Sequence, residues 1–347
     1  MLLNEKNPHG GDIYTHKVLL DFSANINPFG IPETVRKAAV DAIDECTAYP
    51  DPYCRALRKH LSEEEGVPAE WILCGNGAAD LIYSFAYSLP KDKPVLIVSP
   101  TFSEYETALA AAAGIKADHF MLSEQNGFVL DDSILKIDFS KYNALFVCTP
   151  NNPTGITVRP GLLTKLAETG IQLFCDMCFM DLTASPKLYD VPVLLRKYPN
   201  LFVLKAFTKS FAIPGLRLGY ALCSDVKLMA TMAEKSPCWN VSIPAQAAGC
   251  AALECKAWLS DCVKGISAER CRVTEELKSM GIKVYPGEAN FLLLFSEKNL
   301  YSSLLERGIL VRDCSNYRGL QKGFIRIAIR KREENDQLLA AMREVLK

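Results

Sequence analysis

The 347-residue sequence has no long apolar run, no excess of charge of either sign and no cysteine pair with metal-site spacing. No apolar stretch approaches the 18 residues of a membrane-spanning helix. The opening MLLNEKNPHGGD has no apolar signal core, so we expect a cytoplasmic protein. Lys and Arg total 39 and Asp and Glu total 40, which leaves a net charge of -1. We therefore expect a small-molecule ligand and neither nucleic acid nor a membrane surface as a partner.

The thirteen cysteines are an odd number and lie scattered through apolar runs, as at Cys148, Cys175 and Cys223. We expect buried free thiols and no metal site. The GNG turn at Gly75 to Gly77 lacks the third glycine of a dinucleotide-binding fingerprint and the Lys-Ser/Thr pair of a P-loop. A glycine-rich turn that enters a helix can bind a phosphate, but an ordinary strand-to-helix turn is equally consistent with it.

Short apolar runs alternate with segments of helical length through the first two thirds of the chain. This pattern predicts an α/β fold with a mostly parallel sheet that helices cover on both faces. The expected strands are Val95–Ser99, Ala144–Cys148, Ile171–Asp176 and Leu201–Phe207, and the expected helices include Arg55–Glu65, Glu104–Ala113 and Leu162–Glu168.

The pattern changes near Ser236, where a long helical region over 244–280 begins to dominate. The alternating segment 324–330 and a closing helix over 333–346 follow. Alternation predicts a half-exposed strand with Arg326 on its polar face. We therefore expect an N-terminal arm over 1–32 that joins the small domain, a large domain over 33–235 and a smaller α+β domain over 236–347.

Polar residues follow three of the expected strands. Asn152 lies in the turn after one strand, Asp176 ends the next, and Lys209 follows the third. A buried carboxylate at Asp176 needs a cationic partner, either a protonated ring nitrogen or a buried arginine. Arg217 can fold back toward Lys209 after the Pro-Gly turn. Alone, Lys209 reads as a surface lysine, and Phe102 as a packing residue rather than a stacking surface for a flat cofactor.

Taken in this order, Asn152, Asp176, Lys209 and Arg217 resemble the fold-type I pyridoxal-phosphate enzymes. The resemblance covers nearly the whole chain and implies a seven-stranded-type sheet in a large cofactor domain. The motifs HGGD, LDFSANINPFG, YPDPY, PTFSEY, TPNNPTG, IPGLRLGY, YPGEANFLLL and FIRIAIR look most like the threonine-phosphate decarboxylases, and next like the histidinol-phosphate aminotransferases.

The resemblance implies a role for each matching residue. Lys209 would attach covalently to pyridoxal 5'-phosphate and act as acid or base at the substrate α carbon. Asp176 would keep the pyridine nitrogen protonated. The other implied cofactor contacts are Asn152 to the phenolic oxygen, Phe102 to the ring face, Gly77, Ala78, Thr208 and Arg217 to the phosphate, and Tyr49 to the phosphate in the other subunit of a homodimer with shared active sites. The implied contacts to a phosphorylated amino-acid substrate are His9, Asn25, Arg312 and Arg326.

Three positions depart from the family pattern. Ala206 stands where a hydroxyl residue is common, Met177 where a glutamate is usual, and Phe179 where transaminases place a tyrosine. Phe179 favours decarboxylation of L-threonine O-3-phosphate to (R)-1-amino-2-propanol phosphate for cobalamin biosynthesis. The alternatives are a histidinol-phosphate-type aminotransferase and, from another class, a catalytically silent binding protein for phospho-amino acids.

Overall fold

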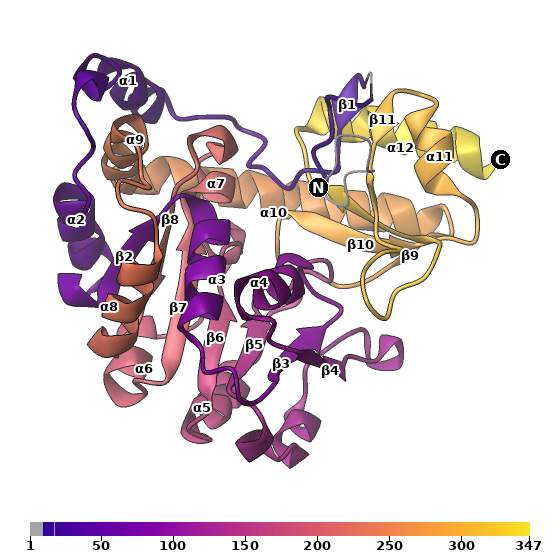
Figure 1. Ribbon diagram of the computed structural model, residues 1–347. Helices are drawn as coiled ribbons and strands as arrows, with labels where there is room; N and C mark the ends of the chain where they lie inside the picture. Colours follow the sequence, from indigo (N-terminus) through magenta and orange to yellow (C-terminus); the bar gives the residue numbers. More distant parts are fainter. Residues whose placement is uncertain (1–9, 17) are drawn as a thin grey trace.

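The computed structural model describes residues 10–16 and 18–347, and its largest element is a seven-stranded sheet (Figure 1). Six strands are parallel to one another, while β8 runs antiparallel to both of its neighbours. The α/β fold with a mostly parallel sheet is therefore confirmed. The strands stand in the order β2 (Ile72–Gly75), β8 (Gly219–Leu222), β7 (Leu201–Ala206), β6 (Gln172–Asp176), β5 (Ala144–Cys148), β3 (Val95–Ser99) and β4 (Ala117–Met121).

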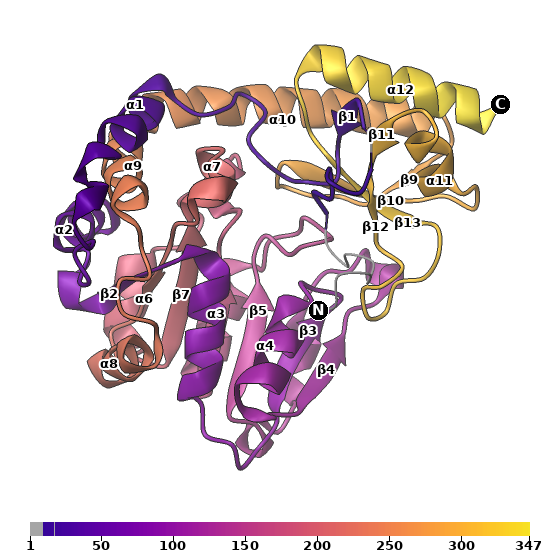
Figure 2. The same ribbon diagram turned by 45° about the horizontal axis from the view of Figure 1, so that its top comes forward.

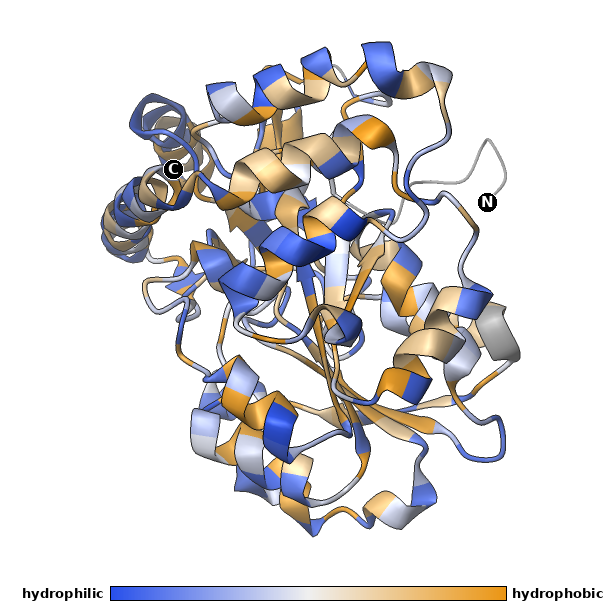
Figure 3. Ribbon diagram, turned by 90° about the vertical axis from the view of Figure 1, so that its left-hand side faces the viewer, coloured by the Kyte–Doolittle hydropathy of each residue, from blue (hydrophilic) through white to orange (hydrophobic). Residues whose placement is uncertain are grey.

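Helices cover both faces of this sheet because successive side chains of its strands point to opposite sides. In β5, Leu145 and Val147 enter one apolar core while Phe146 enters the other. Figure 3 shows the resulting apolar strands between helices of mixed hydropathy. One face carries α2 (Arg55–Glu65), α5 (Pro160–Glu168), α6 (Val191–Lys197) and α9 (Ile243–Leu253), and the other carries α3 (Gly77–Ser88), α4 (Glu104–Ala113) and α8 (Val226–Lys235).

The second sheet is antiparallel and lies in the C-terminal part of the chain. Its strands stand in the order β12 (Arg312–Asp313), β13 (Phe324–Ala328), β10 (Phe291–Phe295) and β9 (Lys283–Val284). The helices of this part are α10 (Lys256–Ser279), α11 (Leu300–Leu305) and α12 (Arg332–Leu346). Figure 2 shows α10 running from the region of α1 (Glu33–Asp41) and α9 to α12.

The N-terminal arm pairs with the C-terminal part. Strand β1 (Leu20–Asp21) lies parallel to β11 (Ile309–Leu310), and Phe22 enters the core that α10 and α12 cover. Helix α9 instead packs on α1 and α2. The division at residues 32 and 235 remains a prediction. Among the described residues, no helix is both long and apolar enough to cross a bilayer.

Two expectations about local structure are wrong. The helical region over 244–280 is broken between α9 and α10. Strand β13 is buried along its whole length, not half-exposed. Ile325 and Ile327 face the helices, while the arm and the loop after β5 cover Arg326 on the other face. Alternation reports the polarity of a face but does not say what covers it. The edge strand β4, with Asp118 and His119 in its middle, was not predicted.

Candidate active site

The strand order brings the predicted residues at three strand ends into one place. Because β5, β6 and β7 are adjacent and parallel, their carboxyl ends meet at one edge of the sheet. Asn152 follows β5, Asp176 ends β6, and Lys209 lies in the short helix α7 (Phe207–Ser210) directly after β7. These three residues therefore lie at the same edge of the sheet.

Asp176 is a buried carboxylate held by two hydrogen bonds. Its Oδ2 accepts from the Tyr105 hydroxyl at 2.6 Å, and its Oδ1 accepts from the backbone N–H of Cys178 at 2.9 Å. Burial raises the pKa of Asp176, and burial also raises the pKa of Tyr105, so that hydroxyl stays a donor. No arginine of the described part of the chain pairs with Asp176. A buried arginine and a protonated ring nitrogen were the two partners expected for Asp176, so a protonated ring nitrogen of a ligand is the one left to consider.

The surroundings of Lys209 favour the neutral form of its amine. Burial is the largest cause that lowers its pKa, from an ordinary 10.5 to about 8, and the charges of Arg326 and Arg217 act in the same direction. In residues 10–16 and 18–347 no side chain accepts a hydrogen bond from its ammonium group. The backbone N–H of Asn27 donates to the Lys209 carbonyl at 3.0 Å, which ties the N-terminal arm to this helix.

Three of the residues predicted to bind the phosphate, Gly77, Ala78 and Arg217, lie close together at the start of α3. Gly77 has a φ of 79°, and a Cβ added to it would lie 2.5 Å from Nη2 of Arg217. A Cβ on Gly219 would lie 2.9 Å from the backbone nitrogen of Ala78. Glycines at both positions therefore let a guanidinium and a helix N-terminus come together, which is a geometry that suits a phosphate. Thr208 is buried at the start of α7.

Two buried arginines face each other across neighbouring strands. Arg312 of β12 pairs in register with Arg326 of β13, and their residues are only 9% and 5% exposed. Arg312 donates to the Asp313 carbonyl at 2.6 Å and to Oδ1 of Asn316 at 2.8 Å. No carboxylate among the described residues pairs with either guanidinium. Like charges directly opposite each other destabilise a sheet, so a bound anion would stabilise this pair of arginines.

Arg326 connects this arginine pair to the residues at the strand ends. It donates to Oδ1 of Asn152 and, at 2.7 Å, to the carbonyl of Ser23, while its Nε has no hydrogen-bond partner among the described residues. The Tyr317 hydroxyl also donates to Oδ1 of Asn152, at 3.3 Å. Asn25, two residues after Ser23, is buried, and neither polar atom of its side-chain amide has a hydrogen-bond partner in the part of the chain that the structure describes. Unpaired buried polar atoms next to a charged cluster are a mark of a ligand site.

Of the remaining predicted residues, Phe102 reaches the cluster through Tyr105, whereas Tyr49 packs on Trp239. The Tyr49 side chain is largely exposed and stacks on Trp239 with ring centroids 4.6 Å apart. His9 lies outside the described residues. Phe102 packs edge-on against Tyr105 at 5.7 Å. Phe179 packs against Phe291 at 5.1 Å and brings no hydroxyl to the site.

Two functional features were missed by sequence reasoning. The first is the hydrogen bond of Tyr105 to Asp176, because the two residues are 71 positions apart. The second is the contact of Arg326 with Asn152, which joins residues 174 positions apart. The position of Tyr105 one helical turn after Phe102 was the only local signal for the first. In the described ranges, no group of three or more His, Cys, Asp or Glu side chains is arranged to hold a metal ion.

Comparison with known proteins places the chain among relatives with the same overall fold. Residues 17–342 match the family described as aminotransferase class I and II. The chain is 39% identical to a threonine-phosphate decarboxylase of Salmonella typhimurium, over 97% of this chain and 96% of that protein. It is 31% identical to a histidinol-phosphate aminotransferase of Methanococcus maripaludis, over 94% of this chain and 90% of that protein.

A solved structure agrees with this assignment. The histidinol-phosphate aminotransferase of Clostridium acetobutylicum superposes with a TM-score of 0.88 at 30% identity, and the match covers 94% of this chain and 99% of that one. Residues 17–342, which match the family model, include the large sheet and the C-terminal part that carries Arg312 and Arg326. The chain therefore belongs to the aminotransferase class I and II family of pyridoxal-phosphate-dependent enzymes.

Proposed function

We propose that this protein decarboxylates L-threonine O-3-phosphate to (R)-1-amino-2-propanol phosphate, with pyridoxal 5'-phosphate as cofactor, in cobalamin biosynthesis. The observation that carries the proposal is the pair of buried arginines, Arg312 and Arg326, near the depressed-pKa amine of Lys209. Two guanidiniums that pair with no carboxylate of the described residues suit a substrate that carries both a phosphate and a carboxylate. The 39% identity to a threonine-phosphate decarboxylase supports the same choice.

The residues present fit the cofactor. Asp176 has two hydrogen bonds but no cationic partner among the described residues, so it can accept from a protonated ring nitrogen. The Gly77 and Ala78 end of α3, together with Arg217, suits the phosphate, because a side chain at residue 77 would occupy that space. Thr208, Asn152 and Phe102 are the further proposed contacts. When bound, pyridoxal phosphate supplies a ring that takes up the electrons released when a bond to the substrate α carbon breaks.

Lys209 has two proposed roles. Its amine holds the cofactor until substrate arrives, and a pKa of about 8 leaves a useful neutral fraction at physiological pH. Once released, its Nζ delivers the proton that replaces the departing carboxyl group at the α carbon. Asp176 stays ionised opposite the ring nitrogen, and the Tyr105 hydroxyl stabilises that charge.

The choice of reaction depends on how the substrate is oriented. The bond that breaks is the one held perpendicular to the cofactor ring, so the groups that bind the phosphate and carboxylate decide between loss of carbon dioxide and loss of the α proton. We propose Arg312, Arg326, Asn25 and His9 for this task. The phenyl ring of Phe179, packed on Phe291, leaves the site without the hydroxyl that transaminases usually place there.

We further propose a cytoplasmic homodimer with shared sites. Exposed apolar side chains lie at the end of α1 and in the segment after it, at Val40, Ile43, Tyr49 and Tyr53. Trp239, which is also exposed, stacks on Tyr49. A second copy of the chain that covers this surface would bring Tyr49 toward its partner's cofactor phosphate.

A histidinol-phosphate-type aminotransferase is the second candidate. The 31% identity to one such enzyme and the 0.88 TM-score to another favour it. Both candidates use the same residues around the cofactor, so only the reaction separates them.

One paired assay tests the proposal. Purified protein with added pyridoxal phosphate is incubated with L-threonine O-3-phosphate, and separately with histidinol phosphate plus a keto acid. We expect carbon dioxide and the amino-alcohol phosphate from the first mixture and little product from the second. Oxo product from histidinol phosphate without carbon dioxide from threonine phosphate would assign the aminotransferase. Binding without turnover in either mixture would assign a silent binding protein.

A further inference from the structure

Residues 315–320 connect the arginine pair to the outer edge of the large sheet. This segment follows β12 and lies at the arginine pair. Asn316 accepts from Nη2 of Arg312 at 2.8 Å, and the Arg312 guanidinium lies 5.1 Å from the centre of the Tyr317 ring. Tyr317 in turn donates to Asn152. The position of the segment therefore sets the direction of Arg312 and one contact of Asn152.

The other side of the segment is held by an ion pair to α4. Nη2 of Arg318 lies 2.8 Å from Oε1 of Glu106, a contact between residues 212 positions apart. The second carboxylate oxygen of Glu106 lies 3.5 Å from Nε2 of His119 on β4. Nδ1 of His119 shares a 2.8 Å hydrogen bond with the hydroxyl of Ser99, the last residue of β3. A chain of polar contacts thus runs from the sheet edge to the segment.

His119 leaves the charge of Glu106 available to Arg318. Burial is the largest cause that lowers the pKa of His119, and the positive charge of Arg318 lowers it further. The negative charges of Glu106 and Asp118 raise the pKa, but less than burial and Arg318 lower it. The ring is therefore neutral at neutral pH. Its buried Nε2 lies 3.5 Å from the Glu106 carboxylate and has no hydrogen-bond partner of good geometry among the described residues.

Packing between the segment and the sheet edge is incomplete here. A cavity of about 390 Å³ lies between them. Its lining includes Phe102, Glu106, His119, Tyr317 and Arg318. Tyr317 and Leu320 are held in an apolar cluster with Phe128 and Phe324, while the Glu106 to Arg318 contact holds the side of residues 315–320 that faces this cavity.

We propose that Glu106 and Arg318, with His119 behind them, are positioning residues that hold residues 315–320 so that Arg312 and Tyr317 face the acidic groups of the substrate. This inference rests on the proposed function in one respect, the assignment of Arg312 to the substrate. Neither member of the ion pair contacts Lys209 or Asp176. Loss of the pair is therefore expected to weaken substrate binding and to leave the chemical step nearly unchanged.

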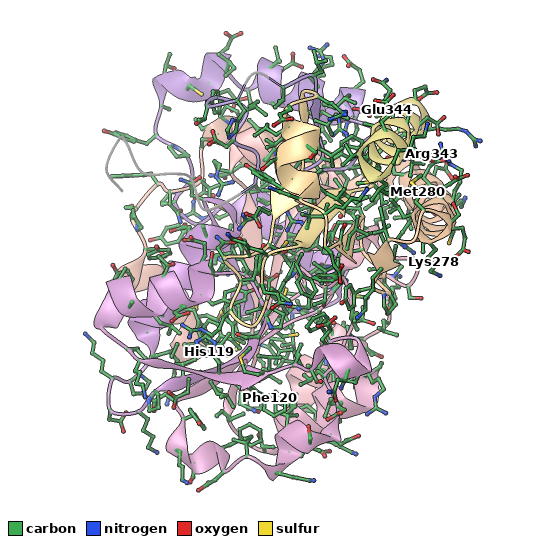
Figure 4. All side chains as sticks on the ribbon, turned by 90° about the vertical axis from the view of Figure 1, so that its right-hand side faces the viewer. His119, Phe120, Lys278, Met280, Arg343 and Glu344 are labelled. Carbon is green, nitrogen blue, oxygen red and sulfur yellow. The ribbon has the colours of Figure 1, made fainter. Side chains whose placement is uncertain are left out.

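The test uses the full-length holoenzyme and single and double variants of the pair, Arg318→Met and Glu106→Gln. The matched control is Arg343→Met, which breaks the pair of Arg343 with Glu276 on α10. The side chains of the control pair are 51% and 38% exposed, close to the 53% and 44% of Arg318 and Glu106. Arg343 lies on the outer helices, away from His119 (Figure 4).

We expect each single variant to raise KM about fivefold, as loss of roughly 1 kcal/mol would do, with kcat within about twofold. The double variant should be no worse than either single one, because both remove the same contact. Arg318→Lys should recover part of the loss, and Arg343→Met should behave as the unchanged protein. Any of three results would overturn the proposal: an unchanged KM in Arg318→Met, a fall in kcat as large as the rise in KM, or additive effects in the double variant.

A second measurement separates this inference from the proposed function. Calorimetric titration of the holoenzyme with L-threonine O-3-phosphate and with histidinol phosphate identifies which ester binds, whichever reaction follows. The ester that binds the unchanged protein should bind Arg318→Met about fivefold more weakly. Failure of decarboxylation with this weakening present would reject only the proposed reaction. Equal binding by both proteins would reject the positioning role.

Discussion

At the scale of single residues, the site depends on groups whose charge state burial controls. Asp176 and Lys209 are both buried, and burial raises the pKa of Asp176 and lowers the pKa of Lys209, because a low-dielectric surrounding disfavours the charged form of each. The consequence is a carboxylate that gains from a cationic ligand and an amine that can lose its proton near neutral pH.

The Tyr105 hydroxyl provides the first test at this scale. Tyr105→Phe removes one of the two hydrogen bonds to Asp176, so the pKa of Asp176 should rise further and its hold on a protonated ring nitrogen should weaken. A hydrogen bond to a charged group contributes about 2 kcal/mol, so cofactor affinity should fall by roughly tenfold or more. Fluorescence titration of the apoprotein with pyridoxal phosphate measures this. Tyr83→Phe, in a partly buried tyrosine of α3 that forms no hydrogen bond to a described residue, is the control and should bind normally.

Lys209 provides a test based on pH. Between about pH 8 and 10.5 the unfolded chain keeps a proton on Lys209 that the folded apoprotein has released. Unfolding then takes up a proton, so the free energy of unfolding should rise with pH across this window, by up to about 3 kcal/mol. Below about pH 8 the full cost of burying the charge remains. Urea denaturation of the apoprotein should show this rise, and Lys209→Met should lack it. Parallel curves for the two proteins would contradict the shift.

At the scale of the elements, the start of α3 is the feature on which cofactor binding depends. Helix α3 follows β2 through a tight turn, and the Arg217 guanidinium occupies the space that a Cβ on Gly77, which has a positive φ, would need. A helix N-terminus attracts an anion more strongly when a guanidinium lies beside it.

Gly77→Ala tests this arrangement. The new Cβ would meet the Arg217 guanidinium and would force an unfavourable φ, so we expect a loss of about 1–2 kcal/mol in stability and a weaker affinity for pyridoxal phosphate. Thermal unfolding and cofactor titration measure the two effects. Gly161→Ala is the matched control, because Gly161 lies in α5 with open space around its Cα and should gain about 0.5–1 kcal/mol from alanine. Equal behaviour of the two variants would argue against a phosphate site at Gly77.

At the scale of the whole molecule, the two sheets divide the chemistry. The large sheet supplies Asn152, Asp176 and Lys209 at its carboxyl edge, and the C-terminal sheet supplies Arg312 and Arg326. The arm ties them together, because Ser23 accepts from Arg326 while Asn27 donates to Lys209.

The proposed dimer with shared sites gives a prediction at the scale of the whole molecule. Tyr49→Ala should lose much of its activity if Tyr49 completes the partner's site, and Lys209→Ala should be inactive. Mixing the two variants under conditions of subunit exchange should restore about a quarter of normal activity, because half of the dimers are hybrids with one intact site. Sedimentation equilibrium establishes the dimer independently. No recovery from verified hybrid dimers would assign Tyr49 to its own subunit or to no site.

The sequence alone was sufficient for the cluster at the carboxyl edge of the large sheet. Apolar runs of strand length marked β3, β5, β6 and β7, and in parallel strands the ends that carry Asn152, Asp176 and Lys209 must lie at one edge. Neither recognising the strands nor aligning their ends needs knowledge of contacts between residues far apart in the sequence. The resemblance to pyridoxal-phosphate enzymes depended on the same local features.

Only the tertiary structure decided how the polar residues pair. The bonds of Tyr105 with Asp176, of Arg326 with Asn152 and of Arg318 with Glu106 join segments far apart in the chain. These contacts depend on the strand register, on the path of the loop after β12 and on the layer that covers β13. None of these three features produces a recognisable pattern in the local sequence. Hydrophobic periodicity determined which face of each element is buried, whereas the packing of those faces on one another determined which charges meet.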